Sequence, residues 1–153
     1  MDTRVEFRIW VIDDTPANLT MIERSFPPAV QASSEIRSFL KAREALAHFD
    51  ALVGTAPEQL PDFILLDYFL DRMYGHQLLD HFLEQYRASE HPPAVIIAHS
   101  SMDEANLMLV ERGADCALEK RKDSPESSAV ARAFRSLDAM RWFKQHRRPQ
   151  PEA

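Results

Sequence analysis

Charged and oxygen-bearing side chains follow several of the short apolar runs in this chain of 153 residues. Asp13 and Asp14 follow the first run, Asp67 follows a later one, and Lys120 comes after the last. Close carboxylates repel one another unless a cation lies among them, and oxygen ligands are those that Mg²⁺ prefers. One carboxylate could then act as the nucleophile, while the metal and Lys120 neutralise the transferred phosphoryl group. These residues therefore indicate magnesium-dependent phosphoryl transfer.

The apolar runs have the length and composition of strands that are buried on both faces of a sheet. They span residues 8–12, 35–39, 63–66, 94–98 and 116–119. Ligands of open α/β sheets bind beyond the carboxyl ends of the strands. The residues that follow these runs are therefore expected to converge on one edge of a sheet.

Patterns of helical period separate the runs and follow the last one. Asp14-Thr15-Pro16 is a typical helix start, and Pro27-Pro28 is expected to end that helix. The remaining helices are predicted from apolar faces around residues 42–53, 78–86, 103–112 and 130–140. The last face consists of Val130, Ala133, Phe134, Leu137 and Met140. Strand and helix thus alternate five times, which predicts an α/β fold with a doubly wound, five-stranded parallel sheet and five helices.

The composition narrows the class of protein. Hydrophobic residues make up 45% and charged residues 27%, as in globular domains, and 18 basic and 24 acidic residues give a net charge of −6. This balance argues against nucleic acid binding, and no apolar run is long enough to span a membrane. The single cysteine, Cys116, excludes an intramolecular disulfide and a cysteine-based zinc site. We expect a cytoplasmic protein with one domain over residues 6–145 and a short tail over 146–153.

The chain resembles the receiver domain of two-component response regulators. Five segments carry the resemblance, which covers nearly the whole chain: Val11-Ile12-Asp13-Asp14, residues 61–67, Met73-Tyr74-Gly75, residues 112–115 and Lys120. The resemblance implies a flavodoxin-like strand order of 2-1-3-4-5. It also implies a stand-alone phosphoacceptor rather than an enzyme. The donor would be a phosphohistidine on a sensor histidine kinase or a histidine phosphotransfer protein of a phosphorelay.

The same resemblance assigns a role to each site residue. Asp67 matches the phosphoacceptor, and Lys120 would pair with the phosphoryl oxygens. Asp14 would bind Mg²⁺ directly, Asp13 would act through water, and Phe69 would offer its backbone carbonyl. Output would pass through protein contacts on the face of the fourth helix, fifth strand and fifth helix, and a homodimer is one form of such a contact.

The chain departs from the family pattern at positions that usually read out phosphorylation. The family's hydroxyl residue at the end of the fourth strand falls on Ala98 by an ungapped count, or on Ile97 with one insertion. Ser100 is the candidate substitute. The usual aromatic switch residue is Ala117, and the usual proline after the lysine is Arg121. These departures predict either that phosphorylation is read through another route or that activation is only weakly coupled to it.

Other residues near the site carry separate hypotheses. Phe69 is bulky and apolar, and it is predicted to slow the attack of water on a phosphoryl group. His99 is predicted to be a surface histidine in a loop. The apolar residues 107–110, Trp142 and Phe143 fall outside the main helix faces, so they indicate either a contact surface or a covering by the C-terminal helix.

Two other functions fit part of the sequence. An interaction module that does not need phosphate would explain Ala117 and Arg121, but it has no need of an acidic cluster. A magnesium-dependent phosphatase resembling the haloacid dehalogenase class would also use an aspartate nucleophile. Such enzymes have an Asp-x-Asp pattern, whereas Asp13 and Asp14 are adjacent here, and a cap domain does not fit in this length.

Overall fold

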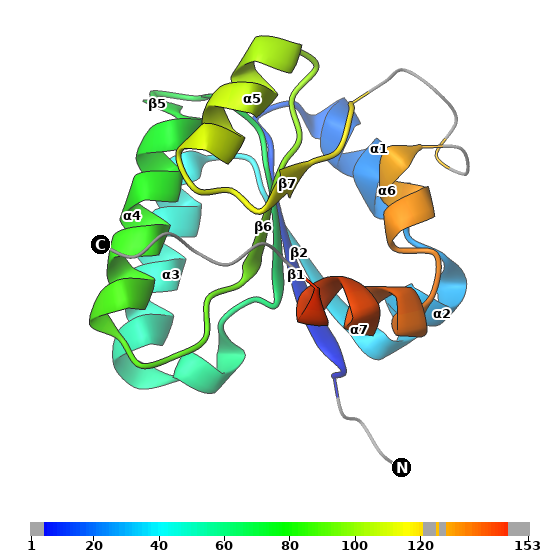
Figure 1. Ribbon diagram of the computed structural model, residues 1–153, viewed down its shortest axis with the longest axis horizontal. Helices are drawn as coiled ribbons and strands as arrows, with labels where there is room; N and C mark the ends of the chain where they lie inside the picture. The colour runs from blue at the N-terminus through cyan, green and yellow to red at the C-terminus, as the bar shows by residue number, and fades with distance from the viewer. Residues whose placement is uncertain (1–4, 121–124, 126–127, 147–153) are drawn as a thin grey trace.

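The computed structural model describes residues 5–120, 125 and 128–146, which form a parallel sheet with helices on both faces (Figure 1). The sheet strands are β1 (Phe7–Ile12), β2 (Ser34–Phe39), β3 (Phe63–Leu66), β6 (Val95–Ala98) and β7 (Cys116–Ala117). Their spatial order is β2-β1-β3-β6-β7, and all neighbours are parallel. The predicted order of 2-1-3-4-5 is therefore confirmed, although β7 is shorter than expected.

The helices divide between the two faces of the sheet. On one face lie α3 (Ala42–Thr55), α4 (Gly75–Ala88) and α5 (Asp103–Glu111). On the other lie α1 (Pro16–Ser25), α2 (Pro28–Ser33), α6 (Ala129–Ala133) and α7 (Leu137–Gln145). A short 3₁₀ turn at Pro57–Gln59 leads into β3. Apolar side chains of successive strand residues enter the two cores alternately, as expected of strands buried on both faces.

The described residues contain seven α-helices rather than the five predicted. Pro27-Pro28 does follow the end of α1, but Pro28 also begins α2, because a proline at the first helical position loses no hydrogen bond. The predicted helix over 130–140 is broken into α6 and α7. Phe134 leaves the helical conformation, and the hydroxyl of Ser136 accepts a hydrogen bond from the Ala139 N–H at 3.0 Å, which caps a new helix.

An antiparallel hairpin of β4 (Phe69–Leu70) and β5 (Met73–Tyr74) follows β3. Its turn contains Arg72, which has a positive φ of 62°. Gly75 then returns the chain to the end of β3, where its N–H donates to the carbonyl of Tyr68 at 2.5 Å. The hairpin therefore closes a loop directly after Asp67.

Of the predicted tail, residues 147–153 lie outside the described residues, and so does Arg121. Among the helices that are described, none combines the length and apolar character needed to cross a membrane.

Candidate functional site

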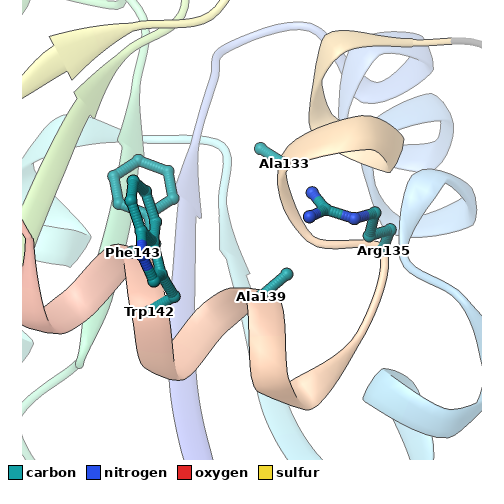
Figure 2. Close-up of a pocket in the computed structure, with 5 residues that line it drawn as sticks. All are labelled: Ala133, Arg135, Ala139, Trp142 and Phe143. Carbon is teal, nitrogen blue, oxygen red and sulfur yellow. The ribbon is translucent and has the colours of Figure 1, made fainter.

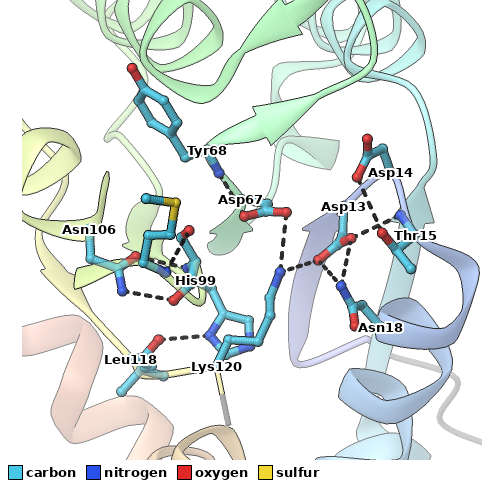
Figure 3. A network of polar contacts seen from close by, with 12 residues as sticks. Asp13, Asp14, Thr15, Asn18, Asp67, Tyr68, His99, Asn106, Leu118 and Lys120 are labelled. Atoms are coloured by element: carbon cyan, nitrogen blue, oxygen red, sulfur yellow. Dashed lines mark hydrogen bonds and ion pairs between the residues drawn. The ribbon is translucent and has the colours of Figure 1, made fainter. Parts of the chain in front are cut away.

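The hydrogen-bond ladder of the sheet continues for one residue beyond the ends of its strands. Each residue at this level donates its N–H to the carbonyl that ends a neighbouring strand. The bonds run from Asp13 to Phe39 (3.1 Å), from Asp67 to Ile12 (3.1 Å), from His99 to Leu66 (2.9 Å) and from Leu118 to Ala98 (2.9 Å). The backbones of Asp13, Asp67 and His99 are thus held side by side at the carboxyl edge of the sheet (Figure 3).

Three carboxylates meet at this edge. Asp13, Asp14 and Asp67 each place a carboxylate oxygen within 4.8 Å of the other two. Asp13 and Asp67 are buried, whereas Asp14 is exposed to solvent. The structure therefore brings together the three aspartates that the sequence places after β1 and β3.

Hydrogen bonds fix the Asp13 carboxylate in place. Its Oδ1 accepts from the Thr15 N–H at 2.9 Å and from the Asn18 side-chain amide at 3.3 Å. The ammonium of Lys120 donates to its Oδ2. Sequence reasoning missed Asn18, although it lies in the first turn of α1, whose start the Asp14-Thr15-Pro16 segment marks.

Lys120 connects the two buried carboxylates. Its Nζ lies 3.2 Å from Asp67 Oδ2 and also contacts Asp13 Oδ2 (Figure 3). The lysine side chain is mostly buried, so this attraction is screened less than a surface ion pair would be. One ammonium against three carboxylates still leaves the cluster negative.

The environment of Asp67 makes its charged form costly. Burial raises the pKa of Asp67 above its ordinary value, and the nearby Asp13 charge raises it further. Lys120 and the Tyr68 N–H, which donates to Asp67 Oδ1 at 2.8 Å, lower the pKa but do not offset burial. An added cation would therefore favour the ionised carboxylate.

The donor set fits a small hard cation. It consists of carboxylate oxygens, which suit Mg²⁺, and the exposed Asp14 faces solvent, where the metal would keep its waters. Phe69 lies two residues after Asp67 in β4, and its side chain is 48% exposed. Its ring contacts the ring of Tyr68, with centroids 4.9 Å apart.

Ser100 takes part in a cap rather than in contacts with the carboxylates. Its N–H donates to Asn106 Oδ1 at 2.8 Å, and its carbonyl accepts from Asn106 Nδ2 at 2.9 Å. Its hydroxyl accepts from the Met102 N–H at 3.2 Å, at the start of α5. No hydrogen bond joins Ser100 to Asp67 among the contacts of the described residues. Asn106, buried inside α5, was not predicted from the sequence.

His99 is buried, which corrects the prediction of a surface histidine. It is 5% exposed and lies level with Asp67, whereas Ala98 and Ile97 are buried in the two cores. Its Nδ1 lies 2.8 Å from the carbonyl oxygen of Leu118. The hydrogen bond from its N–H to the Leu66 carbonyl places His99 level with Asp67. Counting back from Lys120 along the sequence does not show that the two residues are level.

The apolar residues outside the main helix faces divide between surface and core. Leu107 and Met108 on α5 and Trp142 on α7 are exposed. Phe143 packs against Phe134 and Phe63 instead, with ring centroids 6.1 and 5.9 Å apart. Between α6 and α7 lies a groove of about 330 Å³, lined by Ala133, Arg135, Ala139, Trp142 and Phe143 (Figure 2).

Comparisons with known proteins agree with this architecture. No protein-family model and no curated protein sequence matches the chain. The receiver domain of the histidine kinase CKI1 from Arabidopsis thaliana, complexed with Mg²⁺, matches with a TM-score of 0.67 and 18% identity over 86% of this chain and 92% of that one. The phosphorylated cyanobacterial phytochrome response regulator RcpA matches with a TM-score of 0.65 and 18% identity, over 95% and 99% of the two chains.

A longer protein matches through only part of its length. NtrX from Brucella abortus, in complex with ADP, has a TM-score of 0.63 and 22% identity over 91% of this chain but 29% of its own. At these identities the likeness establishes the fold. The chain has the fold of a response regulator receiver domain.

Proposed function

We propose that this protein is a receiver that accepts a phosphoryl group on Asp67 in a magnesium-dependent reaction. The observation that carries the proposal is the position of Lys120, whose ammonium lies between Asp67 and Asp13, while Asp14 completes the acidic cluster. A lone aspartate after a strand has many structural uses. A buried lysine joined to two of three clustered carboxylates is suited to stabilising the charge on a phosphoryl group during its transfer.

The proposed reaction is an in-line displacement at phosphorus. The Asp67 carboxylate attacks, a P–O bond to Asp67 forms, and the bond from phosphorus to the donor nitrogen breaks. The departing imidazole keeps the electron pair and takes a proton from solvent. Lys120 is placed to pair with an oxygen of the incoming phosphoryl group, since its Nζ already lies 3.2 Å from Asp67 Oδ2.

Asp14, Asp67 and the Phe69 carbonyl would hold Mg²⁺, with Asp13 acting through water. When bound, the ion would neutralise charge on the phosphoryl oxygens. The CKI1 receiver complexed with Mg²⁺ and the phosphorylated RcpA support this reading by analogy of fold. Asp13 would orient the site, because four hydrogen-bonding contacts already fix its oxygens.

The donor in this proposal is a phosphohistidine of a sensor kinase or phosphotransfer protein, in a cytoplasmic phosphorelay. Output would be by protein contact, through the surface of α5, β7, α6 and α7, where Leu107, Met108 and Trp142 are exposed. A second copy of the chain is one candidate for that surface. Ala117 offers no ring to move, so readout would differ from the usual family route.

Intact mass spectrometry after incubation with acetyl phosphate tests the proposal. We expect one phosphoryl adduct in the presence of Mg²⁺, none after chelation, and none in Asp67→Ala. Asp14→Asn should slow the reaction strongly, whereas Asp138→Asn, at an exposed position on α7, should not.

Other outcomes favour the alternatives. Failure of both acetyl phosphate and a phosphorylated histidine phosphotransfer domain to give the adduct, with Mg²⁺ binding shown separately, would favour the phosphate-independent module. Repeated hydrolysis of a generic phosphoester would favour the phosphatase.

A further inference from the structure

His99 lies between two segments that shape the site. Its backbone continues β6, and its ring points toward the Leu118 carbonyl (Figure 3). The ring Nδ1 is 2.8 Å from the Leu118 carbonyl oxygen. At 5% exposure the residue is buried almost completely. Among the described residues the ring therefore has a directional partner, as a histidine that joins two buried segments would.

The chemistry of the partner fixes the tautomer of His99. Burial lowers the pKa of His99 to about 4, and the nearby Lys120 charge acts in the same direction. The imidazole is therefore neutral near pH 7. A carbonyl oxygen only accepts hydrogen bonds, so the proton is assigned to Nδ1, and His99 donates to Leu118.

Leu118 is held at both of its backbone groups. Its N–H donates to the Ala98 carbonyl at 2.9 Å, and its own carbonyl accepts from His99. β7 contains only Cys116 and Ala117, so little sheet structure supports the segment that follows. Lys120 comes two residues after Leu118, and its side chain must reach back to Asp67 and Asp13.

We propose that His99 is a positioning residue for Lys120. By donating from Nδ1 to the Leu118 carbonyl, it sets the direction in which the chain leaves β7 and so holds the Lys120 ammonium against Asp67. In this chain a buried imidazole thus supports the lysine. The Ser100 hydroxyl is bonded to the Met102 N–H instead, and Ala98 has no hydroxyl. The relevance of this arrangement to phosphoryl transfer rests on the proposed function.

Three substitutions at one position separate the hydrogen bond from the bulk of the ring. His99→Asn keeps an N–H donor near the place of Nδ1, because the two side chains match as far as that atom. His99→Leu keeps apolar bulk and removes the donor. His99→Gln keeps an amide but carries it one carbon farther, and it serves as the comparison with Asn if the Leu variant does not fold.

The first readout is the reactivity of the Lys120 amine in the protein without phosphodonor. Trace acetylation with acetic anhydride, followed by peptide mass spectrometry, gives the labelling rate of Lys120 relative to the exposed Lys41. We expect His99→Leu and His99→Gln to raise this ratio about fivefold, the factor that corresponds to one lost hydrogen bond. His99→Asn should stay close to the wild type.

The second readout is the rate of phosphoryl adduct formation from acetyl phosphate with Mg²⁺. It should fall in His99→Leu and His99→Gln and be restored in His99→Asn. Unchanged Lys120 labelling in the Leu and Gln variants would overturn the proposal, and so would an Asn variant as impaired as Leu. A wild type that forms no adduct from acetyl phosphate or from a phosphorylated histidine phosphotransfer domain would refute the proposed function, while the labelling experiment would still decide the positioning role.

Discussion

Gly75 lies so close to the backbone of Asp67 that no side chain fits between them. A β-carbon at position 75 would overlap the Asp67 carbonyl oxygen and lie 2.9 Å from the Tyr68 α-carbon. Both obstacles are backbone atoms, which cannot rotate away. The glycine thus allows the β4–β5 hairpin to close against the residue proposed to accept phosphate.

Gly75→Ala should therefore displace the loop that carries Asp67. We expect a loss of about 1–3 kcal/mol in the free energy of unfolding, typical of overpacking, and slower adduct formation from acetyl phosphate. Gly54→Ala is the matched control, because nothing lies within 4 Å of its added β-carbon. Gly54 lies in the last turn of α3, where that change should stabilise by up to about 0.5 kcal/mol. Urea unfolding measures the free energy of unfolding of both variants. A change of the same sign in both would contradict the prediction.

Removing the ammonium of Lys120 should expose the repulsion among the carboxylates. Lys120→Met leaves Asp13 and Asp67 buried without their cation, which is expected to cost about 3 kcal/mol of folding free energy. It should also raise the pKa of Asp67 further. The control is Lys144→Met, which breaks the more exposed pair with Asp62 and should cost less than about 1 kcal/mol. Chemical denaturation at pH 7 gives both values; equal losses would contradict the strong coupling at the site.

Phe69 should lengthen the life of the phosphorylated state. Phe69 is half-exposed and lies two residues from Asp67, so we expect its apolar ring to hinder the approach of water more than an asparagine would. Phe69→Asn is expected to speed loss of the adduct by a factor of the order of ten, since water is no longer kept from the site. Phe69→Leu, which keeps an apolar side chain, should change the rate little. Intact mass spectrometry after removal of the donor gives the rate at which the adduct is lost. Equal rates in the wild type, Phe69→Asn and Phe69→Leu would refute the hypothesis.

Acid should destabilise the fold through His99. Its pKa of about 4 in the folded protein lies below the ordinary value of 6.5, so the unfolded chain binds the extra proton between these values. Stability is therefore lost as pH falls through 6.5, by about 2 kcal/mol at pH 5. Lys120 and Asp13 are the charges that face the ring. Urea unfolding at pH 7 and pH 5 should show a shallower pH dependence in His99→Asn, and parallel curves would contradict the shift.

The sheet and the convergence of its polar residues could be predicted from the sequence because both depend on local patterns. Continuous apolar runs such as Phe63–Leu66 have few alternatives to a buried strand, and the residues after them must share one edge. That rule predicts the meeting of Asp13, Asp67 and Lys120 at this edge. The second face likewise buries Val130 and Phe134, although the helix that carries them was predicted as continuous.

The remaining features depend on contacts that a sequence pattern does not contain. The β4–β5 hairpin has strands of two residues, and its turn places Arg72, rather than glycine or asparagine, at positive φ. His99 could not be placed beside Asp67 by counting, since the register follows from backbone bonds between strands distant in the sequence. The Ser136 cap outweighs a helical pattern that otherwise runs through it.

The row of amides beyond the strand ends has a consequence for hydrogen exchange. The N–H groups of Asp13, Asp67, His99 and Leu118 are all bonded to carbonyls of neighbouring strands. Those of Asp13, Asp67 and His99, which border β1, β3 and β6, should therefore exchange with solvent only when the sheet itself opens, as slowly as the amides of the central strands. The backbone of the site would share the cooperativity of the core, so any response to a phosphoryl group must be carried by side chains and by the loops that follow this row.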